Sequence, residues 1–152
     1  LEFRRVLFRS CGIQATGKTR FFTEQFLQSH VRISMDLLKT RSREEQFLQL
    51  CLKTKQPFVI DNTNPERSVR EKYIRLAKEH GFEVKGYYFQ SKIADALKRN
   101  GERSGTARIP DIGVLSAYNR LEIPAYEEGF DQLYFVEING DSFTINNWKD
   151  AI

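Results

Sequence analysis

Residues 11–22, CGIQATGKTRFF, decide the fold of this chain, because they join a glycine-rich loop to the start of a helical pattern. The segment from Gly12 to Thr19 matches the spacing G-x-x-x-x-G-K-[ST] at every fixed position. Glycines let the backbone N–H groups of such a loop turn onto phosphate oxygens, and the following helix adds the positive end of its dipole. The pattern therefore predicts a phosphate-binding loop in an α/β sheet, and the helical context argues against an incidental glycine loop.

The predicted loop gives each of its residues a role toward ATP. Its backbone would surround the phosphates, and the contributing residues are Gly12, Ile13, Gln14, Ala15, Thr16, Gly17, Lys18 and Thr19. The Lys18 ammonium would reach the β- and γ-phosphates, and the Thr19 hydroxyl would ligate Mg²⁺. ATP and Mg²⁺ are therefore the predicted cofactors.

Composition limits the remaining possibilities. The 152 residues are 40% apolar and 29% charged, which suits one globular domain. No run of about 18 apolar residues occurs, so no membrane partner is predicted. A net charge of +4 neither requires nor excludes a nucleic acid, although basic residues gather in KRNGERSGTAR (98–108). The two cysteines, Cys11 and Cys51, lack metal-binding spacing and indicate a reducing, cytoplasmic setting.

Apolar patterns alternate between strand-like and helix-like along the chain. Strands are predicted over residues 31–35, 57–61, 82–89 and 132–138. Helices are predicted after the loop, over 42–54, from an Asn64 cap to about residue 80, from a Ser91 cap to about residue 99, and over 111–121. Strands separated by helices of 10–15 residues form right-handed crossovers, so the chain is predicted to be an α/β protein with a three-layer parallel sheet.

Helical spacing also predicts which side chains face the core. After the loop these are Phe21, Phe22, Phe26 and Leu27; in the second helix Phe47, Leu48, Cys51 and Leu52; in the third Val69, Tyr73, Leu76 and Ala77.

Several classes of nucleotide-binding protein are excluded by missing motifs. GTPases carry a DxxG switch and an N-K-x-D base reader, and neither occurs in the sequence. Motor and oligomeric ATPases pair the acid at a strand end with a catalytic glutamate, whereas VIDNTNP (59–65) contains one acid, Asp61. Small phosphotransferases remain.

From Cys11 to about Tyr134 the chain resembles the P-loop kinase family that contains the 5′-hydroxyl polynucleotide kinases and the zeta-toxin-like bacterial ATP-binding proteins. The motifs that carry the resemblance are GIQATGKT (12–19), ISMD (33–36), DNTNPERSVR (61–70), LKRNGERSGTARIP (97–110) and EEGFDQLYFV (127–136). The resemblance implies a P-loop NTPase fold of the nucleoside/nucleotide-kinase type with a small arginine lid. It also implies transfer of the ATP γ-phosphate to a hydroxyl acceptor, with the 5′-hydroxyl of a polynucleotide as one candidate.

The resemblance assigns catalytic roles by position. Asp36 matches the carboxylate that accepts the proton of the attacking hydroxyl, and a helix N-cap is its alternative role. Arg99 and Arg103 match the lid arginines that neutralise the transferring phosphate, with a solvated basic helix end as the alternative. Asp61 would hold Mg²⁺ or hydrogen-bond Thr19. Arg108 is a third candidate of the lid.

One departure from the family weakens the preference for nucleic acid. Polynucleotide kinases tend to have an arginine shortly after the strand-end aspartate, and here Lys39 stands three residues after Asp36. The alternatives are therefore a kinase for a nucleoside, sugar or antibiotic, and an ATP-binding module without catalysis. Asp36 and the paired arginines favour a kinase, because binding alone needs neither.

Residues 1–10, LEFRRVLFRS, fit poorly as the strand before the loop. That strand should be central in a parallel sheet and apolar on both faces, yet Arg9 and Ser10 stand directly before Cys11. The stretch RRVLFRS also resembles a translated sequencing adaptor. We therefore expect residues 1–10 to be a non-native leader and residues 11–152 to form a single P-loop kinase domain. A natural, partly exposed first strand is the alternative.

Overall fold

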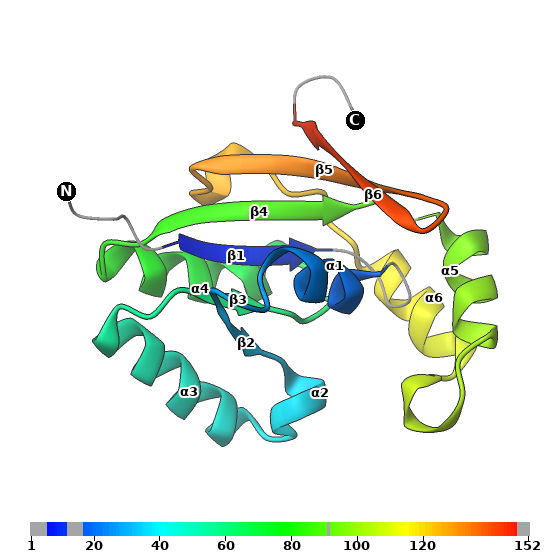
Figure 1. Ribbon diagram of the computed structural model, residues 1–152, viewed down its shortest axis with the longest axis horizontal. Helices are drawn as coiled ribbons and strands as arrows, with labels where there is room; N and C mark the ends of the chain where they lie inside the picture. Colours follow the sequence, from blue (N-terminus) through cyan, green and yellow to red (C-terminus); the bar gives the residue numbers. More distant parts are fainter. Residues whose placement is uncertain (1–5, 12–16, 91, 149–152) are drawn as a thin grey trace.

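Six strands form one sheet in the order β2-β3-β1-β4-β5-β6 (Figure 1). The structure is a computed structural model that describes residues 6–11, 17–90 and 92–148. The strands are β1 (Val6–Cys11), β2 (Val31–Ile33), β3 (Phe58–Ile60), β4 (Glu83–Phe89), β5 (Gln132–Asn139) and β6 (Ser142–Asn147). The first five are parallel and β6 runs antiparallel to β5, so the predicted parallel sheet is confirmed and β6 is an addition to it.

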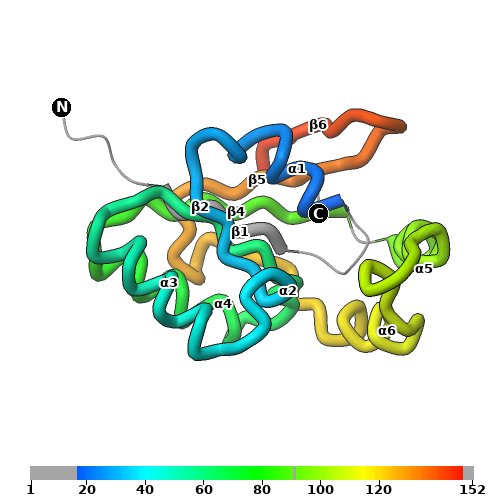
Figure 2. The backbone as a smooth tube through the Cα atoms, turned by 60° about the horizontal axis from the view of Figure 1, so that its bottom comes forward, coloured from blue at the N-terminus to red at the C-terminus, as the bar shows by residue number. Residues whose placement is uncertain are grey.

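The helices lie on both faces of this sheet. They are α1 (Lys18–Gln25), α2 (Met35–Leu38), α3 (Arg41–Thr54), α4 (Arg67–Glu79), α5 (Ile93–Gly101) and α6 (Asp111–Asn119), with short 3₁₀ turns η1 (Gly105–Ala107) and η2 (Tyr126–Glu128). Figure 2 shows α1 on one side of the sheet, and α3 and α4 on the other. None of the helices in the described ranges is long and apolar enough to cross a membrane.

Two apolar cores explain these three layers, since successive strand side chains point to opposite faces. One face contributes Phe58, Ile60, Val84 and Leu133, which pack with residues of α3 and α4 such as Leu48, Leu52, Tyr73 and Ile74. The other face contributes Val59, Tyr87, Phe89 and Val136, which pack with Phe21 and Phe22 of α1. Strands buried on both faces are typical of parallel sheets under helices.

The phosphate loop follows β1, the strand at which the order of the sheet changes direction. The chain passes from β1 out to β2, returns to β3 beside β1, and then crosses to β4 on the other side of β1. Ligands of open α/β sheets bind outside the carboxyl ends of the strands at such a switch point. The segments that follow β1, β2, β3 and β4 therefore surround the expected binding site.

The start of α4 differs from its prediction. The sequence predicts Asn64 as the N-cap, but α4 begins at Arg67 and Glu66 occupies that position. Asn64 has a φ of 41°, and its side-chain amide donates to the Asn62 carbonyl at 3.0 Å. Asn64 therefore belongs to the turn after β3. The predicted cap Ser91 lies outside the described residues, and Lys92 is the N-cap of α5.

Three side chains predicted to face the core are exposed: Leu27, Phe47 and Val69. Two charged side chains, Glu44 and Arg70, are buried on the same helices α3 and α4. Apolar periodicity assigns charged positions to the solvent side, so it misplaces a charged residue that finds a buried partner.

Arg70 finds such a partner in Glu128. Its Nε and Nη2 donate to the two Glu128 carboxylate oxygens at 2.7 and 2.9 Å, and its Nη1 donates to the carbonyls of Asn64 and Pro65 at 3.1 and 3.0 Å. Glu128 also accepts a hydrogen bond from the Ala125 amide. This buried pair ties α4 to η2 and to the turn after β3.

Candidate active site

The end of the phosphate loop is a left-handed glycine at the start of α1. Gly17 has a φ of 83° and is the N-cap of the helix. This conformation favours glycine, and a Cβ at this position would also lie in tight contact, 3.2 Å from side-chain atoms of Ile138 and Phe143. Lys18 and Thr19 form the first turn of α1. The loop residues Gly12, Ile13, Gln14, Ala15 and Thr16 lie outside the described residues, so their roles stay predictions.

Thr19 from the first turn of α1 and Asp61 from the end of β3 come together. The Thr19 hydroxyl donates to Asp61 Oδ2 at 3.3 Å, and the Asp61 side chain is almost fully buried at the end of β3. The predicted hydrogen bond between Thr19 and Asp61 is therefore present. That the two residues bind Mg²⁺ stays a prediction.

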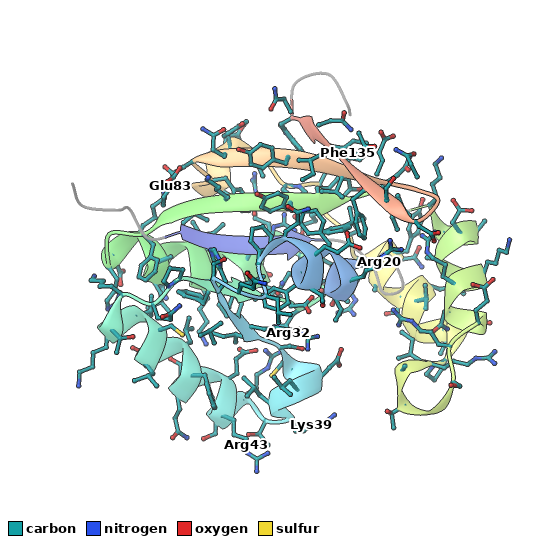
Figure 3. All side chains as sticks on the ribbon, viewed as in Figure 1. Arg20, Arg32, Lys39, Arg43, Glu83 and Phe135 are labelled. Carbon is teal, nitrogen blue, oxygen red and sulfur yellow. The ribbon has the colours of Figure 1, made fainter. Side chains whose placement is uncertain are left out.

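Arg32 of β2 completes this cluster, although no motif in the sequence predicts it as a site residue. Its Nε donates to Asp61 Oδ2 at 2.6 Å and its Nη2 donates to Thr19 Oγ1 at 3.3 Å. Figure 3 shows Arg32 between α1 and α2, whereas Lys39 and Arg43 point outward beyond α2. The available signal was a charged residue in the middle of VRI (31–33), between two apolar residues of a short strand.

The Thr19–Asp61 pair fits a magnesium ion. Mg²⁺ prefers oxygen ligands and is usually held by one or two carboxylates together with substrate phosphates. One hydroxyl and one carboxylate meet here at the start of a helix. Across the described ranges no group of three or more His, Cys, Asp or Glu side chains comes together, so a metal here would rely on phosphate or water oxygens as well.

Asp36 lies on α2, directly beyond the carboxyl end of β2. It is exposed and sits in the first turn, while Ser34 is the N-cap, so the alternative role of Asp36 as a cap is wrong. Because β2 and β3 are parallel neighbours, Asp36 and Asp61 follow strands that end at the same edge of the sheet. Its role as a base stays a prediction.

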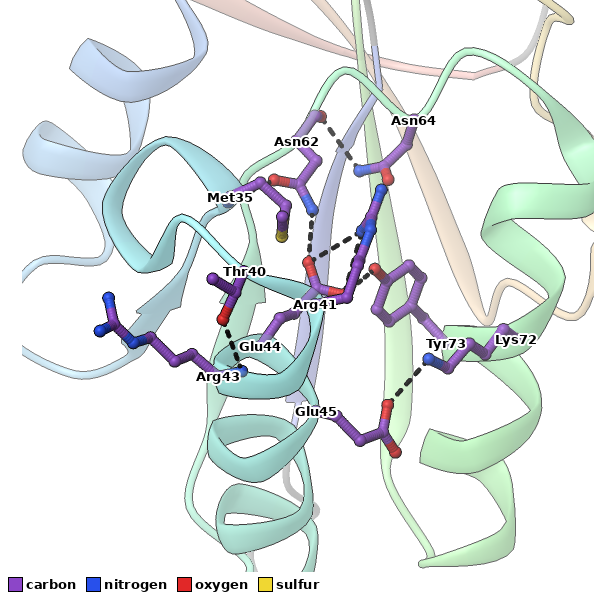
Figure 4. Close-up of polar contacts among 10 residues, drawn as sticks. All are labelled: Met35, Thr40, Arg41, Arg43, Glu44, Glu45, Asn62, Asn64, Lys72 and Tyr73. Carbon is purple, nitrogen blue, oxygen red and sulfur yellow. Dashed lines mark hydrogen bonds and ion pairs between the residues drawn. The ribbon is translucent and has the colours of Figure 1, made fainter.

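A buried polar network joins α2 to the rest of this edge (Figure 4). The Met35 amide donates to Asn62 Oδ1 at 2.9 Å, and Asn62 Nδ2 donates to Glu44 Oε2 at 3.2 Å. The fully buried Glu44 also accepts from the Tyr73 hydroxyl at 2.6 Å and from Arg41 Nη1 at 3.2 Å. The turn after β3 is thus linked to α2, α3 and α4.

The predicted lid is a loop closed by a buried asparagine. Asn100 exchanges hydrogen bonds with both backbone groups of Ile109, at 2.7 and 3.1 Å, and so joins the end of α5 to the start of α6. Arg99 is half-buried in the last turn of α5, and Arg103 follows that helix with its Nη1 donating to the Ala107 carbonyl at 3.2 Å. Arg108 is exposed. Figure 1 shows α5 and α6 beyond the carboxyl ends of β1 and β4, while the clamp role of the arginines stays a prediction.

The sheet order, the glycine that starts α1 and the acidic ends of the following strands define a P-loop NTPase with a nucleotide-kinase-like fold. The family model described as an AAA domain matches residues 7–121, and the chain belongs to this family of P-loop kinase domains.

Relatives and solved structures agree with this assignment. The chain is 31% identical over 146 residues to the bifunctional polynucleotide phosphatase/kinase of Schizosaccharomyces pombe, an alignment that covers 91% of this chain and 36% of the relative. It therefore spans about a third of that protein's length. Its fold is similar to AvrRxo1-ORF1:-ORF2 solved with ATP (TM-score 0.70, 16% identity, 95% of this chain and 58% of that one). It is also similar to a gluconokinase from Sinorhizobium meliloti 1021 (TM-score 0.61, 17% identity, 89% and 85%).

Proposed function

We propose that this chain transfers the γ-phosphate of ATP to a hydroxyl group, with the 5′-hydroxyl of a polynucleotide as the acceptor. The observation that carries the proposal is the meeting of Thr19 and Asp61 at the start of α1, with Asp36 beyond the next parallel strand. A phosphate loop, a metal-binding pair and a separate carboxylate are the parts that phosphoryl transfer to an alcohol requires.

Each residue has a defined task in this reaction. Lys18 and the loop amides would bind the ATP phosphates, and Thr19 and Asp61 would hold Mg²⁺, which would supply positive charge beside the phosphates. The acceptor oxygen forms a bond to the γ-phosphorus while the bond to the β–γ bridging oxygen breaks, and ADP leaves. Asp36 takes the proton of the acceptor hydroxyl. Arg99 and Arg103 would neutralise the charge on the transferring group. A cytoplasmic location accompanies this proposal, since Cys51 is a free thiol.

Two observations support a polynucleotide as the acceptor. The named function of the fission-yeast relative includes a polynucleotide kinase, and the match to it covers nearly all of this chain. The residues that follow Asp36 include the exposed, positively charged Lys39, Arg41 and Arg43, which could bind the phosphates of a polynucleotide. The second candidate is a small alcohol such as a nucleoside, sugar or antibiotic, and Lys39 in place of the family's arginine is the observation that favours it.

Radiolabel transfer from ATP in Mg²⁺ tests the proposal. A 5′-hydroxyl oligonucleotide and a pool of nucleosides, sugars and aminoglycosides serve as acceptors. We expect label on the oligonucleotide, lost in Asp36→Asn and in Lys18→Met but kept in Asp141→Asn, which changes an exposed carboxylate in the β5–β6 turn. Label only in the pool would move the substrate to the second candidate. ATP binding without transfer to any acceptor would instead identify a binding module.

A further inference from the structure

The helix that carries Asp36 is capped by a residue from a neighbouring strand end. The first N–H groups of a helix lack partners within it, and α2 has only four residues. Its N-cap, Ser34, provides no side-chain cap, and the buried Ser34 hydroxyl has no hydrogen-bond partner among the residues the structure describes. The Met35 amide instead donates to Asn62 Oδ1 at 2.9 Å. Asn62 therefore satisfies one of the free N–H groups at the start of α2, although at its first residue rather than at the second or third, where an N-cap side chain normally accepts.

The orientation of the Asn62 amide is fixed by a buried carboxylate. Glu44 accepts hydrogen bonds, so the amide nitrogen of Asn62 must face it and the amide oxygen must face Met35 (Figure 4). Glu44 is itself held by the Tyr73 hydroxyl from α4 and by Arg41. Contacts from α3 and α4 thus determine which atom of Asn62 reaches α2.

We propose that Asn62 is a positioning residue for Asp36, an inference that rests on the proposed function. Asn62 directly follows Asp61, so its cap ties the helix with the proton acceptor to the strand end with the predicted metal ligand. This side-chain contact adds to the backbone hydrogen bond that the Asp61 amide donates to the Ile33 carbonyl at 2.8 Å, so both contacts help to fix the position of α2 relative to the predicted metal ligand. A displacement of about 1 Å in such an arrangement can cost about 100-fold in rate.

The first test removes the cap. In Asn62→Ala we expect kcat for a 5′-hydroxyl oligonucleotide to fall about 10- to 100-fold. We expect KM for ATP to stay unchanged, because Lys18, Thr19 and Asp61 are retained. The matched control is Asp131→Ala, which removes the hydrogen bonds that the Asp131 carboxylate accepts from the Val84 amide at 2.7 Å and from Lys78 at 2.6 Å. This control should lower thermal stability and leave kcat unchanged.

The second test exchanges the amide and the carboxylate. Asn62→Asp places a second carboxylate beside Glu44, and Glu44→Gln replaces one of the two oxygens that accept from Asn62, Tyr73 and Arg41 by an amide donor. The double variant Asn62→Asp/Glu44→Gln again pairs one amide with one carboxylate and keeps an oxygen facing the Met35 amide. We expect each single variant to lose kcat and the double variant to recover most of it.

Hydrogen exchange of the Met35 amide separates this inference from the proposed function. Exchange should accelerate in Asn62→Ala and return toward the wild-type rate in the double variant. Unchanged exchange in Asn62→Ala, or a loss of kcat no larger than in Asp131→Ala, would overturn the positioning role. A wild-type chain that phosphorylates no acceptor would contradict the proposed function, while the exchange rates would still decide whether Asn62 holds α2.

Discussion

The guanidinium of Arg32 donates to the Asp61 carboxylate at 2.6 Å, so the acid at the end of β3 has a cationic partner from the protein itself. The same guanidinium reaches the Thr19 hydroxyl. Arg32 therefore contacts both residues that would hold Mg²⁺. The arginine and a bound Mg²⁺ would both interact with the Asp61 carboxylate.

Replacing this arginine should make the stability of the chain depend on Mg²⁺. Arg32→Gln leaves an almost fully buried carboxylate without a cation, which should cost about 3 kcal/mol of unfolding free energy. Because Mg²⁺ can supply the missing charge, we expect it to raise the melting temperature more in Arg32→Gln than in the wild type. Thermal unfolding with and without Mg²⁺ measures this. Arg75→Gln, from an exposed pair with Glu79, is the control, and equal Mg²⁺ responses would refute the prediction.

The buried pair between Arg70 and Glu128 should dominate the stability of the α4 face. Arg70→Met removes the guanidinium that pairs with the buried Glu128 carboxylate and that donates to the carbonyls of Asn64 and Pro65. Among the described residues, Glu128 then keeps only the Ala125 amide as a hydrogen-bond donor, so we expect a loss of about 3–5 kcal/mol in urea denaturation. In the double variant Arg70→Met/Glu128→Leu the unpaired charge is gone, and part of this loss should return. A double variant as unstable as the single one would show that the carbonyl contacts, rather than the ion pair, carry the effect.

His30 should make the chain less stable in mild acid. Burial, and secondarily the charge of Lys85, lower the pKa of His30 to about 4, against about 6.5 for an unfolded chain. Below pH 6.5 the unfolded chain binds a proton that the folded chain does not, so stability falls between about pH 6.5 and pH 4. Melting temperatures of the wild type and His30→Gln from pH 7 to pH 5 test this. The variant should lose less, and parallel curves would contradict it.

A change in β1 tests the proposed origin of residues 1–10. β1 lies between β3 and β4, and the Cα of Arg9 is opposite Ile60 and Gly86. Central parallel strands are ordinarily apolar on both faces, so we expect Arg9→Val to raise the melting temperature. The neighbouring change Ser10→Val serves as a comparison. A lower melting temperature in Arg9→Val would favour a natural first strand in which the arginine has a purpose.

The parallel sheet and most helices could be predicted because their signals are local. The glycine spacing from Gly12 to Gly17 and the alternation of strands with amphipathic helices each lie within short windows. The sequence also carries a local signal for β6. Gly140 and Asp141 form a two-residue turn between Asn139 and Ser142, with Gly140 at a φ of 60°, as hairpins prefer.

The contacts that position the candidate site could not be predicted in the same way. Arg32 meets Asp61 across a crossover, and Glu44 meets Tyr73 from another helix. Each of these pairs joins residues 29 positions apart in the chain. Amphipathic patterns record only whether a residue is apolar, so they carry no information on which charged side chain will find a buried partner.

The contact of Phe143 with Gly17 and Phe21 has a consequence for how the domain is made. Phe143 lies on the last strand, its ring is 5.3 Å from that of Phe21, and it lies against the glycine that ends the phosphate loop. Ribosomes synthesise the loop early and this strand late, so a nascent chain carries the loop long before its packing partner exists. The start of α1 therefore gains its packing against Phe143 only after translation has passed β6.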